Sequence, residues 1–343
     1  MKLIRFSQGN AQPRFGVVIG EHAIAFATLQ QRRGTTLPEL DDSRAYLAAL
    51  PASEQAVREL AAWGETQVHT WSEAERPKLQ DVRLHAPIEV AALFDFGLTP
   101  RHLKNSAETL MKYEKDNPQT APILQAFAKM LLAKPPAPPH GVPERLSYYK
   151  CNMNSISGDG TTVQWPLYTS RLDIEPELAV VYGNAKQPIA GWCIFNDVSA
   201  RDVQALEFIG GFCLTKDMDQ GNQLGPFLVT ADEVGDPYAL EVVVSVDGQE
   251  RYRGSTAEID HKAEDAFAWL RVISAIQPGT VVGMGTIPDC TGLDHDDFVD
   301  PGAAIEIRFD RLGSLRCRFA EPARRLLPSR WPLREAMKKF HGS

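Results

Sequence analysis

The chain has 343 residues, of which 43% are hydrophobic, and a formal net charge of −8. This length suits one large domain or two unequal ones with a substantial core, and the acidic balance argues against a nucleic-acid-binding protein. No apolar stretch approaches the ~18 residues of a membrane span, no secretory signal is apparent, and the five cysteines form no CxxC pair. We therefore expect a cytoplasmic protein with reduced thiols and no membrane partner.

The N-terminal part of the chain predicts a small β-containing domain. Apolar and polar residues alternate within 1–30 as in short strands, and Gly20-Glu21 marks a hairpin turn. Two helical patterns follow, at about 41–49 and 53–63. A boundary near residue 86 divides the chain into this domain, 1–86, and a larger one, 87–343.

An unusual segment follows the first strand of the larger domain. Residues 90–96 predict that strand, and Thr99 with Pro100 predicts the start of a helix. The helical pattern gives way to a proline-rich stretch at 134–143, which excludes regular helix there. We interpret 105–147 as a helical excursion with a loop, which is either a lid or interface element, or an ordinary surface insertion.

From residue 148 onward the pattern is mainly β. Strands are predicted at 162–165, 177–183, 189–196, 225–230, 240–246, 280–284, 304–309 and 314–319, and one long helix at 257–274. Many strands with few helices between them favour an α+β fold that is mainly β. We expect a mixed β-sandwich or roll in place of a doubly wound sheet.

The candidate chemistry lies in carboxylates, since the sequence has no Walker loop, HExxH, GxSxG or spaced Cys/His cluster. Glu175 and Glu177 flank Pro176 at the head of an apolar strand, where both side chains point to one face. Buried acids need a partner, and oxygen ligands suit Mg²⁺, Mn²⁺ or Ca²⁺ better than Zn²⁺. The alternative is a solvated strand edge.

A second polar group follows the next apolar run. Asp197, Arg201, Gln204 and Phe208 are spaced to share one helical face. An acid, a cation and an amide together predict a polar pocket floor. Alternatively, Asp197 caps a helix and pairs with Arg201, and both interpretations can hold at once.

Five more residues are candidates whose roles the residues alone leave open. Asp95 ends a predicted strand and His102 lies in the first turn of the next helix, although a single histidine is more often structural than catalytic. Lys216 follows an apolar, glycine-rich stretch and is either an oxyanion partner or a surface lysine. Thr286 lies in a turn, and Glu306 lies on a strand with its facing undetermined.

These segments resemble the fumarylacetoacetate hydrolase family. The matching elements are Glu175-x-Glu177, Asn196-Asp197-x-Ser199-Ala200-Arg201-Asp202-x-Gln204, Lys216 with Gly225-Pro226 after it, and Gly285-Thr286-x-Pro288. The match covers about 90–320, and its core at 170–216 is specific. The resemblance implies a mixed β-roll catalytic domain, a homodimer, a carboxylate-bound Mg²⁺ or Ca²⁺, and a small-molecule substrate.

The resemblance also implies roles for individual residues. The implied metal ligands are Glu175, Glu177, Asp197 and, as in fumarylacetoacetases proper, Asp95. His102 is the implied general base, and Glu306 the residue that orients it. The positions that match substrate-binding or oxyanion groups are Arg201, Gln204 and Lys216, and Thr286 matches a position that binds a substrate carboxylate.

The pocket departs from that of fumarylacetoacetases. Two pocket tyrosines correspond here to Gly97 and Phe208, and either Tyr148 or Tyr149 replaces another. We assign Tyr149 and Phe208 to the substrate pocket. The departures put fumarylacetoacetate itself in doubt as the substrate.

We therefore expect a metal-dependent hydrolase that cleaves a carbon–carbon bond of a β-diketo acid, such as an acylpyruvate. His102 would take a proton from water, and Lys216 with Gln204 would stabilise the oxyanion. The same metal site could instead serve decarboxylation, isomerisation or dehydration of a sugar acid. A third possibility is an inert ligand-binding relative, which the missing pocket tyrosines favour.

Overall fold

The computed structural model describes residues 1–112, 122, 125–126, 129, 133, 137–207 and 211–323. The strands of the main sheet are β1 (Lys2–Ser7), β2 (Arg14–Ile19), β3 (His22–Ala25), β4 (Arg83–Leu84), β5 (Ala92–Phe96), β6 (Tyr148–Lys150), β7 (Ile156–Ser157), β10 (Pro176–Tyr182), β11 (Ile189–Asp197), β13 (Asn222–Val229) and β16 (Thr280–Thr286). A second sheet holds β8 (Thr161–Val163), β14 (Glu241–Val246), β15 (Gln249–Ser255), β17 (Ala304–Phe309) and β18 (Gly313–Phe319), and a small one holds β9 (Leu172–Asp173) and β12 (Ser199–Ala200).

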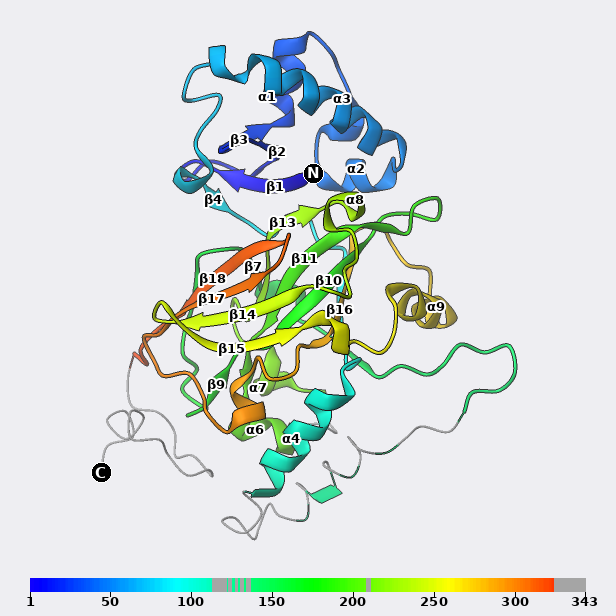
Figure 1. Ribbon diagram of the computed structural model, residues 1–343, viewed down its shortest axis with the longest axis vertical. Coiled ribbons are helices and arrows are strands. Elements are labelled where there is room, and N and C mark those ends of the chain that lie inside the picture. Colours follow the sequence, from blue (N-terminus) through cyan, green and yellow to red (C-terminus); the bar gives the residue numbers. More distant parts are fainter. Residues whose placement is uncertain are drawn as a thin grey trace.

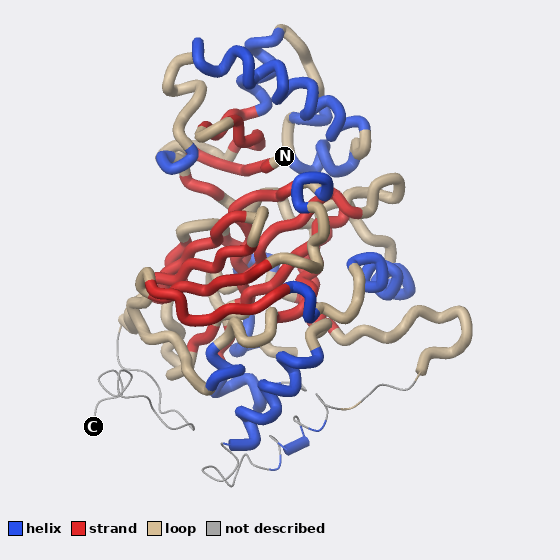
Figure 2. Tube along the Cα trace, viewed as in Figure 1, coloured by secondary structure: helices blue, strands red, loops and turns tan. Residues whose placement is uncertain are grey.

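Helices lie mostly at the two ends of the sheets (Figure 1). The helices α1 (Phe26–Arg33), α2 (Ser43–Ala48) and α3 (Ala52–Gln67) gather at the N-terminal end, together with β1 to β3. At the opposite end lie α4 (Pro100–Lys112), α6 (Arg201–Glu207) and α7 (Cys213–Lys216). The other α-helices of the described residues are α8 (Ala231–Val234), α9 (Ala263–Ile273) and α10 (Gly292–His295). The predicted α+β, mainly β fold is thus confirmed, as Figure 2 shows.

The main sheet has the order β3-β2-β1-β13-β11-β10-β16-β5-β6. The neighbours along this path are antiparallel except β16 and β5, which run parallel. The strands β5, β11 and β16 therefore end at the same edge at which the antiparallel β10 begins. This edge collects side chains that are far apart in the chain.

The strand β10 separates two hydrophobic cores. Leu178 and Val180 pack into one cluster, with Trp192 and Met284, whereas their neighbour Val181 packs into the other. Alternate side chains of a strand point to opposite faces, so a strand covered on both sides is apolar throughout. Burial of each such side chain contributes roughly 1.5–3 kcal/mol to stability, which fixes β10 and the acids at its start.

The N-terminal strands continue the main sheet. β1 pairs with β13, with Leu3 opposite Leu228. The hairpin at Gly20 forms as predicted, with a positive φ of 58° that favours glycine. The division of the chain at residue 86 stays a prediction.

The structure adjusts two predicted helices. The helix predicted at 257–274 begins later, at Ala263, where the Asp265 side chain accepts from the Lys262 backbone N–H at 2.9 Å. The excursion at 105–147 begins with the end of α4, and most of the remainder up to residue 136 lies outside the described residues.

All five cysteines are free. Within the described ranges, no helix is long and apolar enough to cross a membrane.

Candidate metal centre and catalytic base

Three buried carboxylates meet at the common edge of the main sheet. Asp95 lies near the end of β5, Glu175 immediately precedes β10, and Asp197 ends β11. One oxygen from each of the three lies within 4.8 Å of the others. Like charges held this close in a buried site need a cation between or beside them.

Lys216 and Tyr149 contact this acidic cluster, which comprises Asp95, Glu175 and Asp197. The ammonium group of Lys216 binds the carboxylates of Glu175 and Asp197, and the Tyr149 hydroxyl donates to Asp197. The second oxygen of Asp197, Oδ1, is buried and has no hydrogen-bond partner within the described parts of the chain. A buried, unpartnered carboxylate oxygen in an all-oxygen cluster fits a hard divalent cation such as Mg²⁺, Mn²⁺ or Ca²⁺.

Burial and mutual repulsion shift the protonation of these acids. Burial, followed by the charge of Asp197, raises the pKa of Asp95 well above its usual value. Burial also raises the pKa of Asp197, against the opposing effect of Lys216. Glu175 differs, because Arg201 and Lys216 outweigh its burial and lower its pKa. The ionised forms of Asp95 and Asp197 are thus disfavoured, and an added cation would stabilise them.

Glu177 lies apart from the three clustered oxygens. Its Oε2 accepts from the Gly285 backbone N–H at 3.1 Å, and its Oε1 accepts from Thr286 Oγ1 at 3.3 Å. A Cβ at Gly283 would lie 2.4 Å from Glu177 Oε2, so glycine is needed there for the carboxylate to pack against β16. Burial and the charge of Asp95 raise the pKa of Glu177. Its place among the metal ligands stays a prediction.

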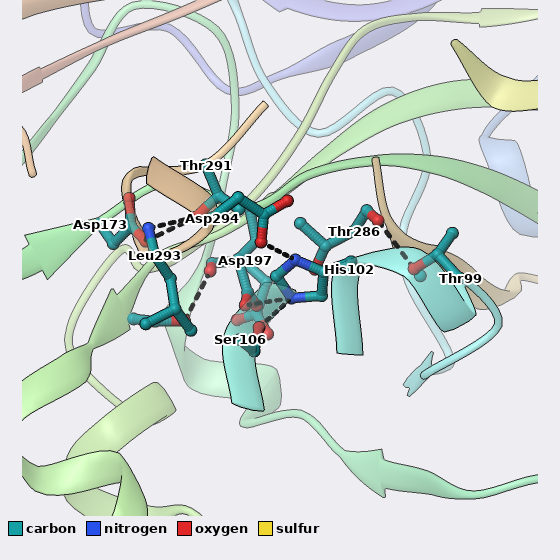
Figure 3. Close-up of polar contacts among 12 residues, drawn as sticks. Thr99, His102, Ser106, Asp173, Asp197, Thr286, Thr291, Leu293 and Asp294 are labelled. Atoms are coloured by element: carbon teal, nitrogen blue, oxygen red, sulfur yellow. Dashed lines mark hydrogen bonds and ion pairs between the residues drawn. The ribbon is translucent and has the colours of Figure 1, made fainter. Parts of the chain in front are cut away.

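His102 lies in the first turn of α4 and faces the acidic cluster. Its Nδ1 is 2.8 Å from Asp294 Oδ1, and its Nε2 is 3.8 Å from Glu175 Oε1 and 3.4 Å from Ser106 Oγ (Figure 3). A carboxylate only accepts hydrogen bonds, so Nδ1 carries the proton and Nε2 is left as the basic atom. The imidazole is therefore oriented with its base toward the cluster.

The expectation that Glu306 orients His102 is wrong. The Glu306 side chain is 41% exposed and binds Arg316 Nε at 2.8 Å and Ser314 Oγ at 3.1 Å. Its strand alternates, with Ile305 and its alternate neighbours buried, so Glu306 points away from the core. Asp294, which was not predicted from the sequence, makes the contact with His102 that was expected of Glu306.

Arg201 joins the acidic cluster to a second buried acid. It binds Glu175 Oε1 at 2.7 Å and Asp173 Oδ2 at 2.8 Å, and it also donates to Gln204 Oε1 at 2.9 Å. Asp197 belongs to β11 and α6 begins at Arg201, so Asp197 does not cap this helix. The arginine and amide predicted to share one face do lie together.

Asp173 was also missed, and it holds the segment that carries Asp294. Its oxygens accept from the Thr291 hydroxyl and from the backbone N–H groups of Gly292 and Leu293, both at the start of α10. An acid that accepts from the first N–H groups of a helix stabilises that end. Only the Thr286-to-Pro288 motif hinted that this loop belongs to the site.

The remaining predicted residues fall into three groups. Thr286 lies at the site through its bond to Glu177, and the Thr99 hydroxyl donates to the Thr286 carbonyl (Figure 3). Tyr149 donates to Asp197 in the cluster, whereas Tyr148 packs against Phe94 and Phe96, so Tyr149 is the better placed of the two. Phe208 lies outside the described residues.

Comparison with known proteins gives a family match and similar folds. Residues 123–320 match the family described as fumarylacetoacetate (FAA) hydrolase C-terminal. A human mitochondrial protein named oxaloacetate tautomerase is 35% identical over 182 residues, which cover 50% of this chain and 58% of the human protein. The chain spans less than two thirds of the length of the curated relatives it matches.

Two solved structures share the fold over nearly the whole chain. The 5-carboxymethyl-2-hydroxymuconate delta-isomerase of Mycobacterium smegmatis has a TM-score of 0.60 and 21% identity, and covers 94% of this chain and 100% of that one. Maleylpyruvate hydrolase of Sphingobium sp. SYK-6, solved with manganese(II) and pyruvate, has a TM-score of 0.62 and 20% identity over the same shares. At these identities the likeness establishes the fold.

Proposed function

Because the chain belongs to the fumarylacetoacetate hydrolase family, we propose that it is a metal-dependent hydrolase that cleaves a carbon–carbon bond of a β-diketo acid related to acylpyruvates. The observation that carries this proposal is the base, His102 Nε2, held beside the acidic cluster by Asp294. The printed names of the similar proteins include a hydrolase, an isomerase and a tautomerase. The reaction itself is therefore the part that needs a test.

The metal would be held by Asp95, Glu175 and Asp197, with Glu177 as a further or supporting ligand. When bound, a divalent ion such as Mg²⁺ would polarise the keto oxygens of the substrate as a Lewis acid. The manganese(II) and pyruvate bound to the Sphingobium hydrolase support an ion of this class with a keto acid.

The proton transfers are assigned to His102. Nε2 takes a proton from water, and the resulting hydroxide attacks a carbonyl carbon of the substrate. Asp294 then stabilises the imidazolium through Nδ1–H, as a buried carboxylate does for a catalytic histidine. The same imidazolium returns its proton to the carbon released when the bond breaks.

Substrate orientation is assigned to the cations and hydroxyls around the cluster. Lys216, whose pKa is raised because the acids Asp197 and Glu175 outweigh its burial, stays charged and would stabilise the oxyanion. Gln204 and Arg201 would add donors beside it, and Thr286 with Tyr149 would contact the substrate acid. The substrate-binding role predicted for Phe208 stays a prediction.

The proposal is tested by incubating the enzyme with a panel of acylpyruvates and Mg²⁺, Mn²⁺ or Ca²⁺, and measuring pyruvate and the released acid. His102→Ala should abolish this release, while calorimetric titration with Mn²⁺ should show that the variant still binds metal. Unchanged product release in the variant would remove His102 as the base and overturn the mechanism.

A second candidate, enol–keto tautomerisation of oxaloacetate, is favoured by the 35% identity to the human tautomerase. That reaction needs proton transfer at Nε2 but no attacking water. Enol decay followed by ultraviolet absorbance, with pyruvate release measured in parallel, separates it from hydrolysis and from decarboxylation. An inert binding protein is disfavoured, because a ligand-binding site has no need of an oriented base.

A further inference from the structure

The His102 ring has a second hydrogen-bond partner besides Asp294, and the proposed function does not use it. Ser106 Oγ lies 3.4 Å from His102 Nε2, on the opposite side of the ring from the 2.8 Å contact between Nδ1 and Asp294 Oδ1 (Figure 3). Ser106 is one helical turn beyond His102 on α4, and side chains four positions apart on a helix are neighbours. The Ser106 hydroxyl, the His102 imidazole and the Asp294 carboxylate thus form a chain of hydrogen bonds.

The direction of the hydrogen bonds follows from the carboxylate. Asp294 accepts a hydrogen bond from Nδ1–H, and the proton stays on the ring. Nε2 therefore carries a lone pair, and Ser106 can only donate a hydrogen bond to it. A serine hydroxyl that donates to a histidine oriented by an acid is the arrangement that activates a serine nucleophile, and it recurs on unrelated folds. The 3.4 Å separation is at the long end, as is common before a substrate binds.

Ser106 shares the burial of the groups already assigned to the reaction. Its exposure is 4%, compared with 6% for His102 and 3% for Lys216. Because the two atoms are 3.4 Å apart, a small molecule that reaches His102 Nε2 also comes close to Ser106 Oγ. Thr109, on the same helix, is also buried, at 1%.

We propose that Ser106 is a nucleophile toward activated acyl donors such as aryl esters, in a reaction that needs no metal and does not depend on the proposed diketo-acid hydrolysis. The Ser106 Oγ–H proton passes to His102 Nε2 as Oγ forms a bond to the acyl carbon. The bond from that carbon to the aryloxide then breaks, and the phenol leaves with the proton from Nε2. Water, deprotonated by Nε2, later attacks the Ser106 ester, which frees the carboxylic acid and returns the proton to Oγ.

The test uses the full-length chain treated with EDTA and then mixed with p-nitrophenyl acetate. We expect a burst of p-nitrophenol followed by slower turnover, and an acetyl group on Ser106 located by peptide mass spectrometry. Ser106→Ala and His102→Ala should each lower the burst rate by about 10²-fold or more. The matched control Thr109→Ala removes another buried hydroxyl of α4 and should keep the burst.

Thermal denaturation checks that each variant is folded. If a variant folds poorly, the acetyl adduct in the wild type alone tests whether Ser106 is the nucleophile. A burst that persists in folded Ser106→Ala, an acetyl group on Lys216 or Tyr149 in place of Ser106, or no adduct in the wild type would each overturn the assignment. Diketo-acid cleavage by the Mg²⁺-loaded wild type is measured separately. Failure of that reaction bears on the proposed function and leaves the Ser106 result standing.

Discussion

Asp294 Oδ1 lies 2.8 Å from His102 Nδ1, and the two residues are 192 positions apart in the chain. The contact joins α10, which follows β16, to the first turn of α4. The other oxygen of Asp294 accepts from the Asp289 backbone N–H at 2.8 Å, so the carboxylate is itself held in place. This pair sets both the tautomer and the direction of the proposed base.

Replacing Asp294 by asparagine is expected to lower kcat for diketo-acid cleavage by about 10²-fold or more, with KM little changed. The amide keeps the shape of the side chain but can neither fix the Nδ1–H tautomer nor stabilise the imidazolium. Steady-state kinetics on the substrate accepted by the wild type measures both constants.

The matched control for this variant is Glu306→Gln. Glu306 was expected to orient His102 but lies on an exposed face with Arg316, so its loss should leave kcat within error of the wild type. Equal losses in the two variants would contradict the role given to Asp294.

Asp173 is expected to matter for stability. It is fully buried, bonds to the Arg201 guanidinium, and accepts from the backbone at the start of α10. Asp173→Ala removes one of the two acids that pair with the buried Arg201 and leaves the N–H groups of Gly292 and Leu293 without their acceptor. Removing one partner of a buried ion pair typically costs about 3–5 kcal/mol. Urea denaturation measures the free energy of unfolding. The control is Asp236→Asn, which changes an exposed acid and should keep the free energy of unfolding within about 0.5 kcal/mol of the wild type. A loss for Asp173→Ala as small as the control's would show that the bonds of Asp173 contribute little.

The acidic cluster could be predicted from the sequence because each of its acids adjoins an apolar strand. Once those strands share a sheet, Asp95, Glu175 and Asp197 must meet at one edge. The sequence left the facing of Glu306 undetermined, and only the resemblance to fumarylacetoacetases gave it a role at His102. Its exposed position on β17, bound to Arg316, contradicts that role.

Asp173 and Asp294 could not be predicted, because their partners lie far away in the chain. Arg201 and Gly292 are 28 and 119 positions from Asp173, and no local pattern encodes such pairs. The pairing of β1 with β13 is non-local in the same way. The sequence therefore predicted most strands and three acids that the fold brings together, while the packing between elements supplied Asp173 and Asp294.

Metal affinity should separate Asp197 from Glu177. Asp197 offers an unpartnered oxygen within the cluster, whereas both oxygens of Glu177 accept from Gly285 and Thr286. We expect Asp197→Asn to abolish Mn²⁺ binding measured by titration calorimetry. Glu177→Gln should lower the affinity by about 10–100-fold, the range found for groups that support ligands. Complete loss of binding in Glu177→Gln would instead make it a direct ligand, as the family resemblance implied.

Mg²⁺ should stabilise the folded protein through the same carboxylates. The cluster exists only when β5, β10 and β11 are part of one sheet, so the ion would bind the native state in preference to the unfolded chain. At a free concentration one hundred times the dissociation constant, this preference adds about 2.7 kcal/mol to the free energy of unfolding. Urea denaturation with Mg²⁺, and again with EDTA, measures the difference, and Asp197→Asn should abolish it. An equal Mg²⁺ effect in Asp197→Asn would place the stabilising ion elsewhere on the protein.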